Sequence, residues 1–157
     1  MKTAELYNKA AVYCSVAERC KQDVMEKLAA WDPENTDGMG EIVQKLEAEG
    51  FLNEERYARA FAGDKLRFQG WGRMKIRAAL QAKKVPATAI AAALNELDEA
   101  TYREKLRQLR ERKLRELRGE KDAFVKRQKV SRFLLGRGFT LDEIVAEEGI
   151  EPTTFRL

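Results

Sequence analysis

The sequence predicts an all-α protein built from three tandem three-helix modules. Of its 157 residues, 36% are charged and 44% are hydrophobic, and only three are proline. Ala, Leu, Glu, Lys and Arg dominate, and these are strong helix formers. A chain with so much charge suits thin helical layers with a large solvated surface better than one thick core. The number of modules comes from a repeated apolar pattern.

Two helices and a turn open the chain. Apolar residues at helical spacing predict a first helix over Thr3–Cys14. Ser15–Glu18 reads as a capping box that begins the second helix. That helix carries one apolar stripe, formed by Cys20, Val24, Leu28 and Trp31. The residues of Asp32–Gly38 favour turns and therefore end it.

The third and fourth helices are joined at a glycine. Ile42, Val43 and Leu46 mark the third helix, and Gly50 is its expected left-handed cap. Asn53 is placed to cap the fourth helix. The apolar side of that helix is assigned to Tyr57, Phe61, Leu66 and Phe68. Gly70 and Gly72 then break the chain around Trp71.

Two shorter helices follow this break. The first is Arg73–Ala82, with Ile76, Ala79 and Leu80 facing inward. Its basic residues, with those just after it, are expected to point largely outward: Arg73, Lys75, Arg77, Lys83 and Lys84. Pro86 suits the first turn of the next helix, whose apolar face is Ile90, Ala93, Leu94 and Leu97.

The last three helices are marked by their caps. Asp98 is expected to cap a long basic helix that ends near Gly119. A further helix over Asp122–Leu135 ends at Gly136 and Gly138. Thr140–Glu143 is a second capping box, and it opens a short final helix.

The middle helix of each module shares a pattern. Val24 and Leu28, Ile76 and Leu80, and Val130 and Leu134 repeat the same four-residue spacing at intervals near 53 residues. The predicted modules are residues 1–50, 51–98 and 99–149, followed by a tail at 150–157. Such modules stack on shared apolar faces, so an elongated, curved helical array is expected.

Enzymatic groupings are missing from the sequence. There is no histidine, which excludes His-dependent triads, and no phosphate-binding glycine loop. We expect no catalytic residue, no cofactor and no metal, and assign Asp142 and Glu143 to helix capping. Cys14 and Cys20 are interpreted as buried free thiols in a reducing compartment. With no signal peptide and no membrane span, the prediction is a cytoplasmic, monomeric protein.

Positive charge is concentrated in the middle and late parts of the chain. Residues 101–138 hold 14 Lys and Arg against 5 Asp and Glu, whereas residues 1–50 hold 6 against 10. Two basic sets form the candidate binding surface, which would bind single- or double-stranded DNA through phosphates. The first set is Lys65, Arg67, Arg73, Lys75, Arg77, Lys83 and Lys84, and the second is Lys126, Arg127, Lys129, Arg132 and Arg137.

Several interpretations of this surface remain open. Trp71 could stack on a base, although a wedge between modules is the favoured interpretation. No helix has the pattern of a sequence-reading element, so nucleic-acid binding would be non-specific. The charged side of such a helix can also simply face solvent, without a binding role. Alternatively, the basic residues can bind an acidic protein.

Three segments resemble the RecX family, the bacterial regulators of the RecA recombinase. Gly50–Phe61, the Gly70 and Gly72 break, and Ile76–Val85 together resemble the family's central module. Lys129–Phe139 is similar to the last module and Ser15–Leu28 to the first. Two positions depart from the family pattern: Arg73 stands where proline is usual, and Lys84 where glycine commonly follows.

The resemblance implies a function without catalysis. It implies binding in the groove of a RecA filament on DNA, contact with neighbouring RecA subunits, and restraint of the recombinase. The family has no catalytic residues to transfer to this sequence. Only the basic face is transferred, as a hypothesis.

Overall fold

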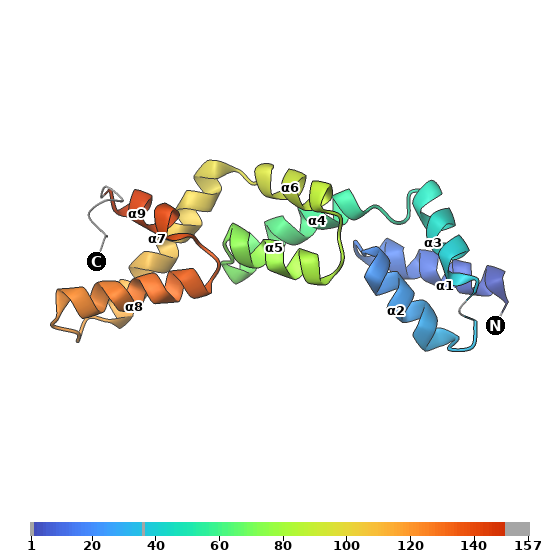
Figure 1. Cartoon of the computed structure of the whole chain (residues 1–157), viewed down its shortest axis with the longest axis horizontal. Coiled ribbons are helices and arrows are strands. Elements are labelled where there is room, and N and C mark those ends of the chain that lie inside the picture. Colours follow the sequence, from blue (N-terminus) through green and yellow to red (C-terminus); the bar gives the residue numbers. More distant parts are fainter. Residues whose placement is uncertain (1, 36, 150–157) are drawn as a thin grey trace. The chain divides into compact units, whose positions relative to one another are not determined.

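The computed structural model describes residues 2–35 and 37–149, and every regular element in these ranges is helical (Figure 1). The α-helices are α1 (Thr3–Val16), α2 (Lys21–Trp31), α3 (Met39–Ala48), α4 (Glu54–Asp64), α5 (Arg73–Ala82), α6 (Ala87–Asn95), α7 (Glu99–Glu116), α8 (Ala123–Gly136) and α9 (Leu141–Glu148). A π-helical turn, η1 (Lys65–Gln69), follows α4. The all-α prediction is confirmed, and the expected tail at 150–157 lies outside the described residues.

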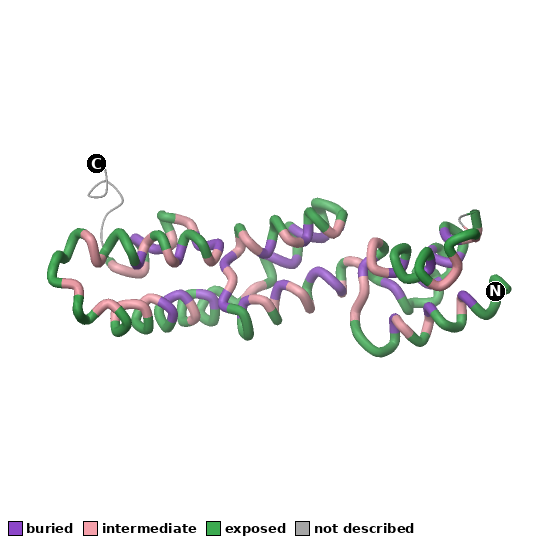
Figure 2. Tube along the Cα trace, turned by 90° about the horizontal axis from the view of Figure 1, so that it is seen from below, coloured by how far each residue is buried: buried purple, intermediate pink, exposed green. Residues whose placement is uncertain are grey.

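The predicted repeat is present in the structure. Its six apolar positions all lie in the middle helices α2, α5 and α8, and all six side chains are buried. Buried residues alternate with exposed ones along the helices (Figure 2), as amphipathic packing requires. The chain is therefore a tandem series of three-helix groups, α1–α3, α4–α6 and α7–α9.

Two compact units divide the chain at different positions from the helix groups. The first unit contains the described residues up to Ala60 together with Leu80–Ala93. The second contains Phe61–Ala79 and the described residues from Leu94 onward. The middle group therefore contributes residues to both units.

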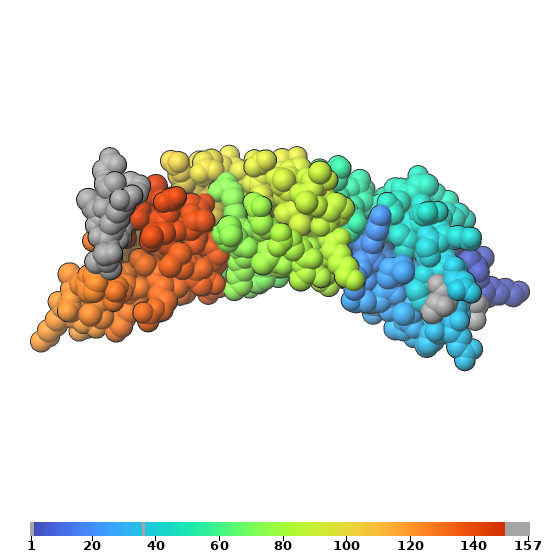
Figure 3. Space-filling view, in the orientation of Figure 1, coloured from blue at the N-terminus to red at the C-terminus, as the bar shows by residue number. Residues whose placement is uncertain are grey.

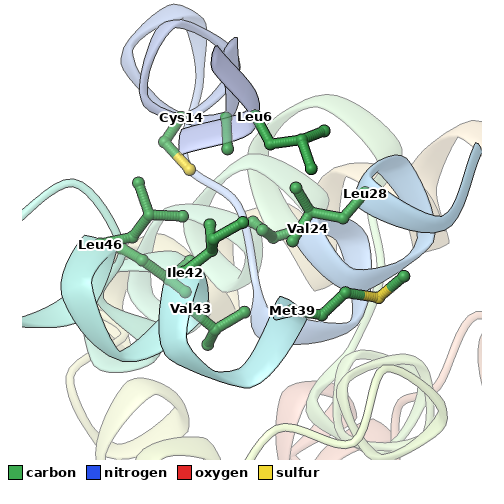
Figure 4. Close-up of a cluster of buried hydrophobic side chains, with 10 residues drawn as sticks. Leu6, Cys14, Val24, Leu28, Met39, Ile42, Val43 and Leu46 are labelled. Atoms are coloured by element: carbon green, nitrogen blue, oxygen red, sulfur yellow. The ribbon is translucent and has the colours of Figure 1, made fainter. Parts of the chain in front are cut away.

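The core of the first unit is formed by the inner faces of α1, α2 and α3 (Figure 4). Its side chains point toward one another and include Leu6 and Cys14 of α1, Val24 and Leu28 of α2, and Met39, Ile42, Val43 and Leu46 of α3. Cys14 and Cys20 are buried free thiols, as predicted. Burial raises the pKa of the Cys20 thiol to about 11, so the thiol is neutral near pH 7.

The predicted capping box at Ser15–Glu18 is wrong. Helix α1 continues through Val16, and the Ser15 hydroxyl donates to the Val12 carbonyl 2.7 Å away. A serine in the last turn of a helix can donate a hydrogen bond to a carbonyl of the preceding turn instead of capping the next helix. The N-cap of α2 is Cys20, whose N–H donates to the Asp23 carboxylate.

The junction between α3 and α4 follows the prediction. Gly50 has a φ of +82°, and the amides of Phe51 and Leu52 both donate to the Leu46 carbonyl. The Asn53 side chain accepts a hydrogen bond from the Arg56 amide at 3.0 Å. A left-handed glycine and an asparagine cap therefore turn the chain here.

The end of α5 contains a residue in a strained conformation. Lys84 has a φ of +59°, and it is the non-glycine residue with positive φ in the described part of the chain. The Lys84 amide donates to Gln81 and the Val85 amide donates to Leu80, which closes the helix. This geometry favours glycine, since a Cβ crowds the backbone in the left-handed region.

In the second unit, α7 and α8 form a helical hairpin, and α9 contacts both helices. Figure 3 shows α8 and α9 as neighbouring parts of one surface. The predicted caps are present: Asp98 accepts from the Thr101 amide, and Thr140 and Glu143 form a capping box. Asp122 caps α8 through the amides of Phe124 and Val125.

The π-helical turn explains an error in the predicted apolar stripe. Leu66 is buried as expected, but Phe68 is 76% exposed. Phe68 lies within η1, and a π-helical turn has more residues per turn than an α-helix, so its residues fall on other faces than α-helical spacing predicts. The stripe assigned by α-helical spacing therefore fails at Phe68.

Gly72 and Gly138 bring two loops into direct backbone contact. The Gly72 amide donates to the Arg137 carbonyl at 2.8 Å, and the Met74 amide donates to the Gly138 carbonyl at 3.0 Å. A Cβ at Gly72 would lie 2.5 Å from the Gly138 oxygen, and one at Gly138 would lie 2.4 Å from the Cβ of Lys75. The predicted break at Gly70–Gly72 is present between η1 and α5, and the Gly72–Gly138 contact joins the second helix group to the third.

Substitution of these glycines is expected to destabilise the fold. Gly72→Ala and Gly138→Ala should each lower the free energy of unfolding by about 2–3 kcal/mol, because the new methyl group overlaps backbone atoms. Gly136→Ala is the matched control, since nothing lies within 4 Å of its added Cβ. Urea denaturation measures all three, and equal stability of Gly72→Ala and Gly136→Ala would contradict the contact.

The strain at Lys84 is testable by a pair of substitutions. Lys84→Gly should stabilise the protein by about 0.5–1 kcal/mol relative to Lys84→Ala, because glycine removes the left-handed strain at some cost in unfolded-chain entropy. Both variants remove the same charge, so the difference between their free energies of unfolding, measured by heat or urea, reports the effect of the backbone conformation. A less stable glycine variant would show that residue 84 does not adopt positive φ.

Candidate nucleic-acid interface

The predicted basic residues are divided between the two units. Lys83 and Lys84 belong to the first unit, and the other ten belong to the second. Their surroundings also differ, since some contact aromatic rings, some pair with carboxylates and some are simply exposed.

Lys83 forms an ion pair within the first unit. Its ammonium lies 2.8 Å from the Asp23 carboxylate, and this hydrogen bond raises the pKa of Lys83. Partial burial opposes ionisation of Asp23, but bonds from Lys83 and Cys20 hold the pKa of that carboxyl below its usual value. Lys83 thus fixes the end of α5 to the start of α2, and Lys84 beside it is exposed.

Trp71 brings two lysines together in the second unit. The ammonium groups of Lys65 and Lys75 each lie 4.7 Å from the centre of the indole ring. Phe61 packs against the same ring in an edge-to-face arrangement, with centroids 6.4 Å apart. Cation–π attraction therefore holds two positive charges at a partly buried tryptophan.

Arg137 adds a third cation beside the glycine contact. Its guanidinium donates to the Gln69 carbonyl at 3.0 Å and lies 5.4 Å from the centre of the Phe133 ring. Its own carbonyl accepts the Gly72 amide, which anchors it next to the Trp71 loop. We call Lys65, Trp71, Lys75 and Arg137 the Trp71 surface.

The prediction that Arg73 points outward is wrong. Its side chain is 25% exposed and pairs with Glu99 at 2.9 Å and Glu143 at 3.2 Å. The guanidinium lies 3.9 Å from the centre of the Tyr102 ring, and the Arg73 amide donates to the Tyr102 hydroxyl. Arg73 therefore holds α5 to α7 and α9, because the start of α5 lies beside their acidic side chains.

The other basic residues are more dispersed. Arg67 pairs with Asp64, Arg127 with Glu148 and Lys129 with Glu120, at distances of 3.2–3.4 Å. Arg77 and Arg132 are exposed, and Lys126 is half-buried. These residues contribute positive charge outside the Trp71 surface.

The acidic partners of Arg73 lie in a group of carboxylates on α7 and α9. A hollow of about 210 Å³ between α7 and α9 includes Glu99, Asp142, Glu143 and Glu147 in its lining. Arg73 and Arg107 already pair with three of these carboxylates. In residues 2–35 and 37–149, no group of three or more His, Cys, Asp or Glu side chains is placed to hold a metal ion.

Sequence reasoning missed two partners of the basic residues. The first is Tyr102, whose hydroxyl and ring both contact Arg73. The second is Phe133, since Lys113 and Arg137 lie 5.0 and 5.4 Å from its ring centre. Aromatic residues near arginines were the available signal, although spacing alone does not pair them.

Comparison with known families matches the second and third helix groups. Residues 53–94 match the second three-helix domain of RecX, and residues 101–146 match the third three-helix domain. Together the two matches cover more than half of the sequence. The chain belongs to the RecX family. The boundaries predicted for its three modules remain a proposal.

Similar RecX proteins include two from clostridia. The regulatory protein RecX of Clostridium botulinum (strain Eklund 17B / Type B) is 34% identical over 117 residues, which are 73% of this chain and 54% of that protein. The regulatory protein RecX of Clostridium perfringens (strain 13 / Type A) is 31% identical over 125 residues, 79% of this chain and 58% of that protein. The matched region thus spans little more than half the length of these relatives.

Two solved structures share the fold. The crystal structure of RecX from Lactobacillus salivarius matches with a TM-score of 0.82 and 26% identity, over 94% of each chain. A second crystal structure of regulatory protein RecX matches with a TM-score of 0.84 and 22% identity, over 94% of this chain and 71% of that one. None of the helices described here is long and apolar enough to cross a membrane.

Removal of the Arg73 side chain is expected to weaken the second unit. Arg73→Ala should lower the free energy of unfolding by about 2 kcal/mol, since Glu143 loses its charged partner. Arg73→Lys should lose less stability than Arg73→Ala but remain below the parent protein, because one ammonium group cannot reproduce the two guanidinium–carboxylate contacts. Urea denaturation with Arg77→Ala as the exposed control tests the network, and equal losses at both positions would contradict it.

Proposed function

We propose that this chain regulates the RecA recombinase by binding in the groove of the RecA filament on DNA. Bound there, it restrains ATP hydrolysis and strand exchange during homologous recombination and DNA repair. It acts as a cytoplasmic monomer, by binding alone, and needs neither a cofactor nor a catalytic residue. RecX family membership and the tandem helical fold support this proposal.

The observation that carries the proposal is the Trp71 surface. Lys65 and Lys75 are held at one tryptophan, and Arg137 is fixed beside them at the glycine contact. Cations held in place lose less conformational freedom on binding than free side chains do. A phosphate backbone, alone or within a filament, is therefore a suitable ligand.

Two other functions remain as alternatives. A protein that acts only on nucleic acid would bind naked DNA tightly and would not need the recombinase. An adaptor for an acidic protein would bind DNA negligibly at physiological salt. Co-sedimentation with preformed RecA filaments and with naked DNA separates these functions, and we expect the chain to prefer the filament.

The direct test is recombinase activity. ATP hydrolysis and strand exchange by RecA from the same organism should both fall when this protein is added at amounts stoichiometric with RecA. Normal rates of both reactions would contradict the proposal. A nuclease would be recognised in the same reactions by Mg²⁺-dependent cleavage of the DNA.

The contribution of the Trp71 surface is tested by salt dependence. The double variant Lys65→Ala, Lys75→Ala should reduce the slope of log affinity against log salt by up to about 1.4 on single strands, if each lysine contacts one phosphate. Arg112→Ala, Arg118→Ala removes the same charge from exposed positions outside the candidate set. Arg73→Ala should leave the slope unchanged, because its guanidinium is already bound to carboxylates.

An unchanged slope in the lysine variant would show that the Trp71 surface does not contact phosphate. An equal reduction in the control variant would show that total charge, rather than this surface, determines binding. Far-ultraviolet circular dichroism of each variant establishes that the helices are intact.

A further inference from the structure

The α7–α8 hairpin carries a groove that the Trp71 surface does not include. It has a volume of about 330 Å³ and is lined by Lys113, Leu117, Lys129, Arg132 and Phe133. Leu117 and Phe133 are half-buried and supply apolar carbon, while three cations surround them. The groove therefore offers an apolar floor with a positive rim.

Two of the rim cations already contact carboxylates of the chain itself. Lys129 lies 3.2 Å from Glu120, and Lys113 lies 3.3 Å from Glu116. A hydrogen bond from the Asp122 amide, with another from Lys129, lowers the pKa of Glu120. Carboxylates thus fit this rim, and both internal pairs are close to solvent and exchangeable.

The charges around the groove are less suited to a polynucleotide than to a peptide. Glu116 and Glu120 pair with Lys113 and Lys129, and they would repel a continuous row of phosphates. The acidic groups of a peptide can alternate with neutral backbone, so its carboxylates can reach the cations without forming such a row.

We propose that this groove binds an acidic peptide segment of a protein partner, with one apolar side chain of the segment on Leu117 and Phe133. Asp or Glu residues of the segment flank that side chain and pair with Lys129, Arg132 and Lys113. Arg132 is exposed and therefore accessible to the first carboxylate. The groove would add a protein contact next to the Trp71 surface, since Arg137 of that surface lies over Phe133.

The test uses a labelled eight-residue peptide of Asp and Glu with one central Phe, and the full-length chain. Fluorescence anisotropy should show saturable binding that weakens about tenfold in the variant Lys129→Glu, Arg132→Glu. Arg112→Glu, Arg118→Glu makes the same charge change at exposed positions outside the groove and should retain binding. Replacement of the central Phe by Ser should also weaken binding, by about fivefold, because the floor loses its apolar contact.

A Leu117→Ser variant tests the floor without a change in charge. It should bind the Phe peptide as weakly as the parent protein binds the Ser peptide, provided that circular dichroism shows intact helices. Equal loss in the Arg112 and Arg118 variant would overturn the proposal in favour of a general basic face. Displacement of the peptide by oligothymidylate of equal charge would overturn it in favour of nucleic acid, and a dimer abolished by Lys129→Glu, Arg132→Glu would favour a second copy of the chain.

Discussion

The close approach of Gly72 and Gly138 determines how the second unit is built. Two backbone hydrogen bonds cross between their loops, and neither position has room for a Cβ. The contact places Trp71 and Lys75 on one side of the joint and Arg137 on the other. It also positions Arg73 directly after Gly72, where its guanidinium reaches the acidic residues of α7 and α9. A cation cluster and a structural ion-pair network thus depend on one pair of glycines.

The same joint divides the basic residues by role. Arg73 and Lys75 are two positions apart on α5, so they face different sides of the helix. Arg73 forms ion pairs with carboxylates, which neutralise its charge within the fold. Lys75 instead lies over the Trp71 indole ring, which does not neutralise its charge. Net positive charge therefore overstates the surface available to a polyanion. Which cations remain available depends on the acidic and aromatic residues that the fold places opposite them.

Helix positions were largely predictable from sequence, because apolar spacing and cap residues act over a few positions. Arg73–Ala82 was predicted with its observed bounds, and the caps at Asn53, Asp98 and Thr140 are present. The wrong predictions concern residues whose conformation or contacts do not follow from local spacing and cap residues. The Ser15 hydroxyl donates to a carbonyl in the preceding turn of its own helix. Phe68 does not lie on the predicted apolar face because the chain forms a π-helical turn there. The outward assignment of Arg73 failed because Glu99, Tyr102 and Glu143 are distant in sequence.

The two departures from the family pattern have physical consequences at opposite ends of α5. At position 73, proline would suit the first helical turn but would lack the amide that donates to Tyr102. Arginine keeps that bond and adds two ion pairs across the joint. At position 84, lysine accepts a left-handed conformation that glycine adopts without strain. Arginine at the start of α5 therefore adds ion pairs that proline could not form, whereas lysine at its end holds a conformation that glycine adopts without strain.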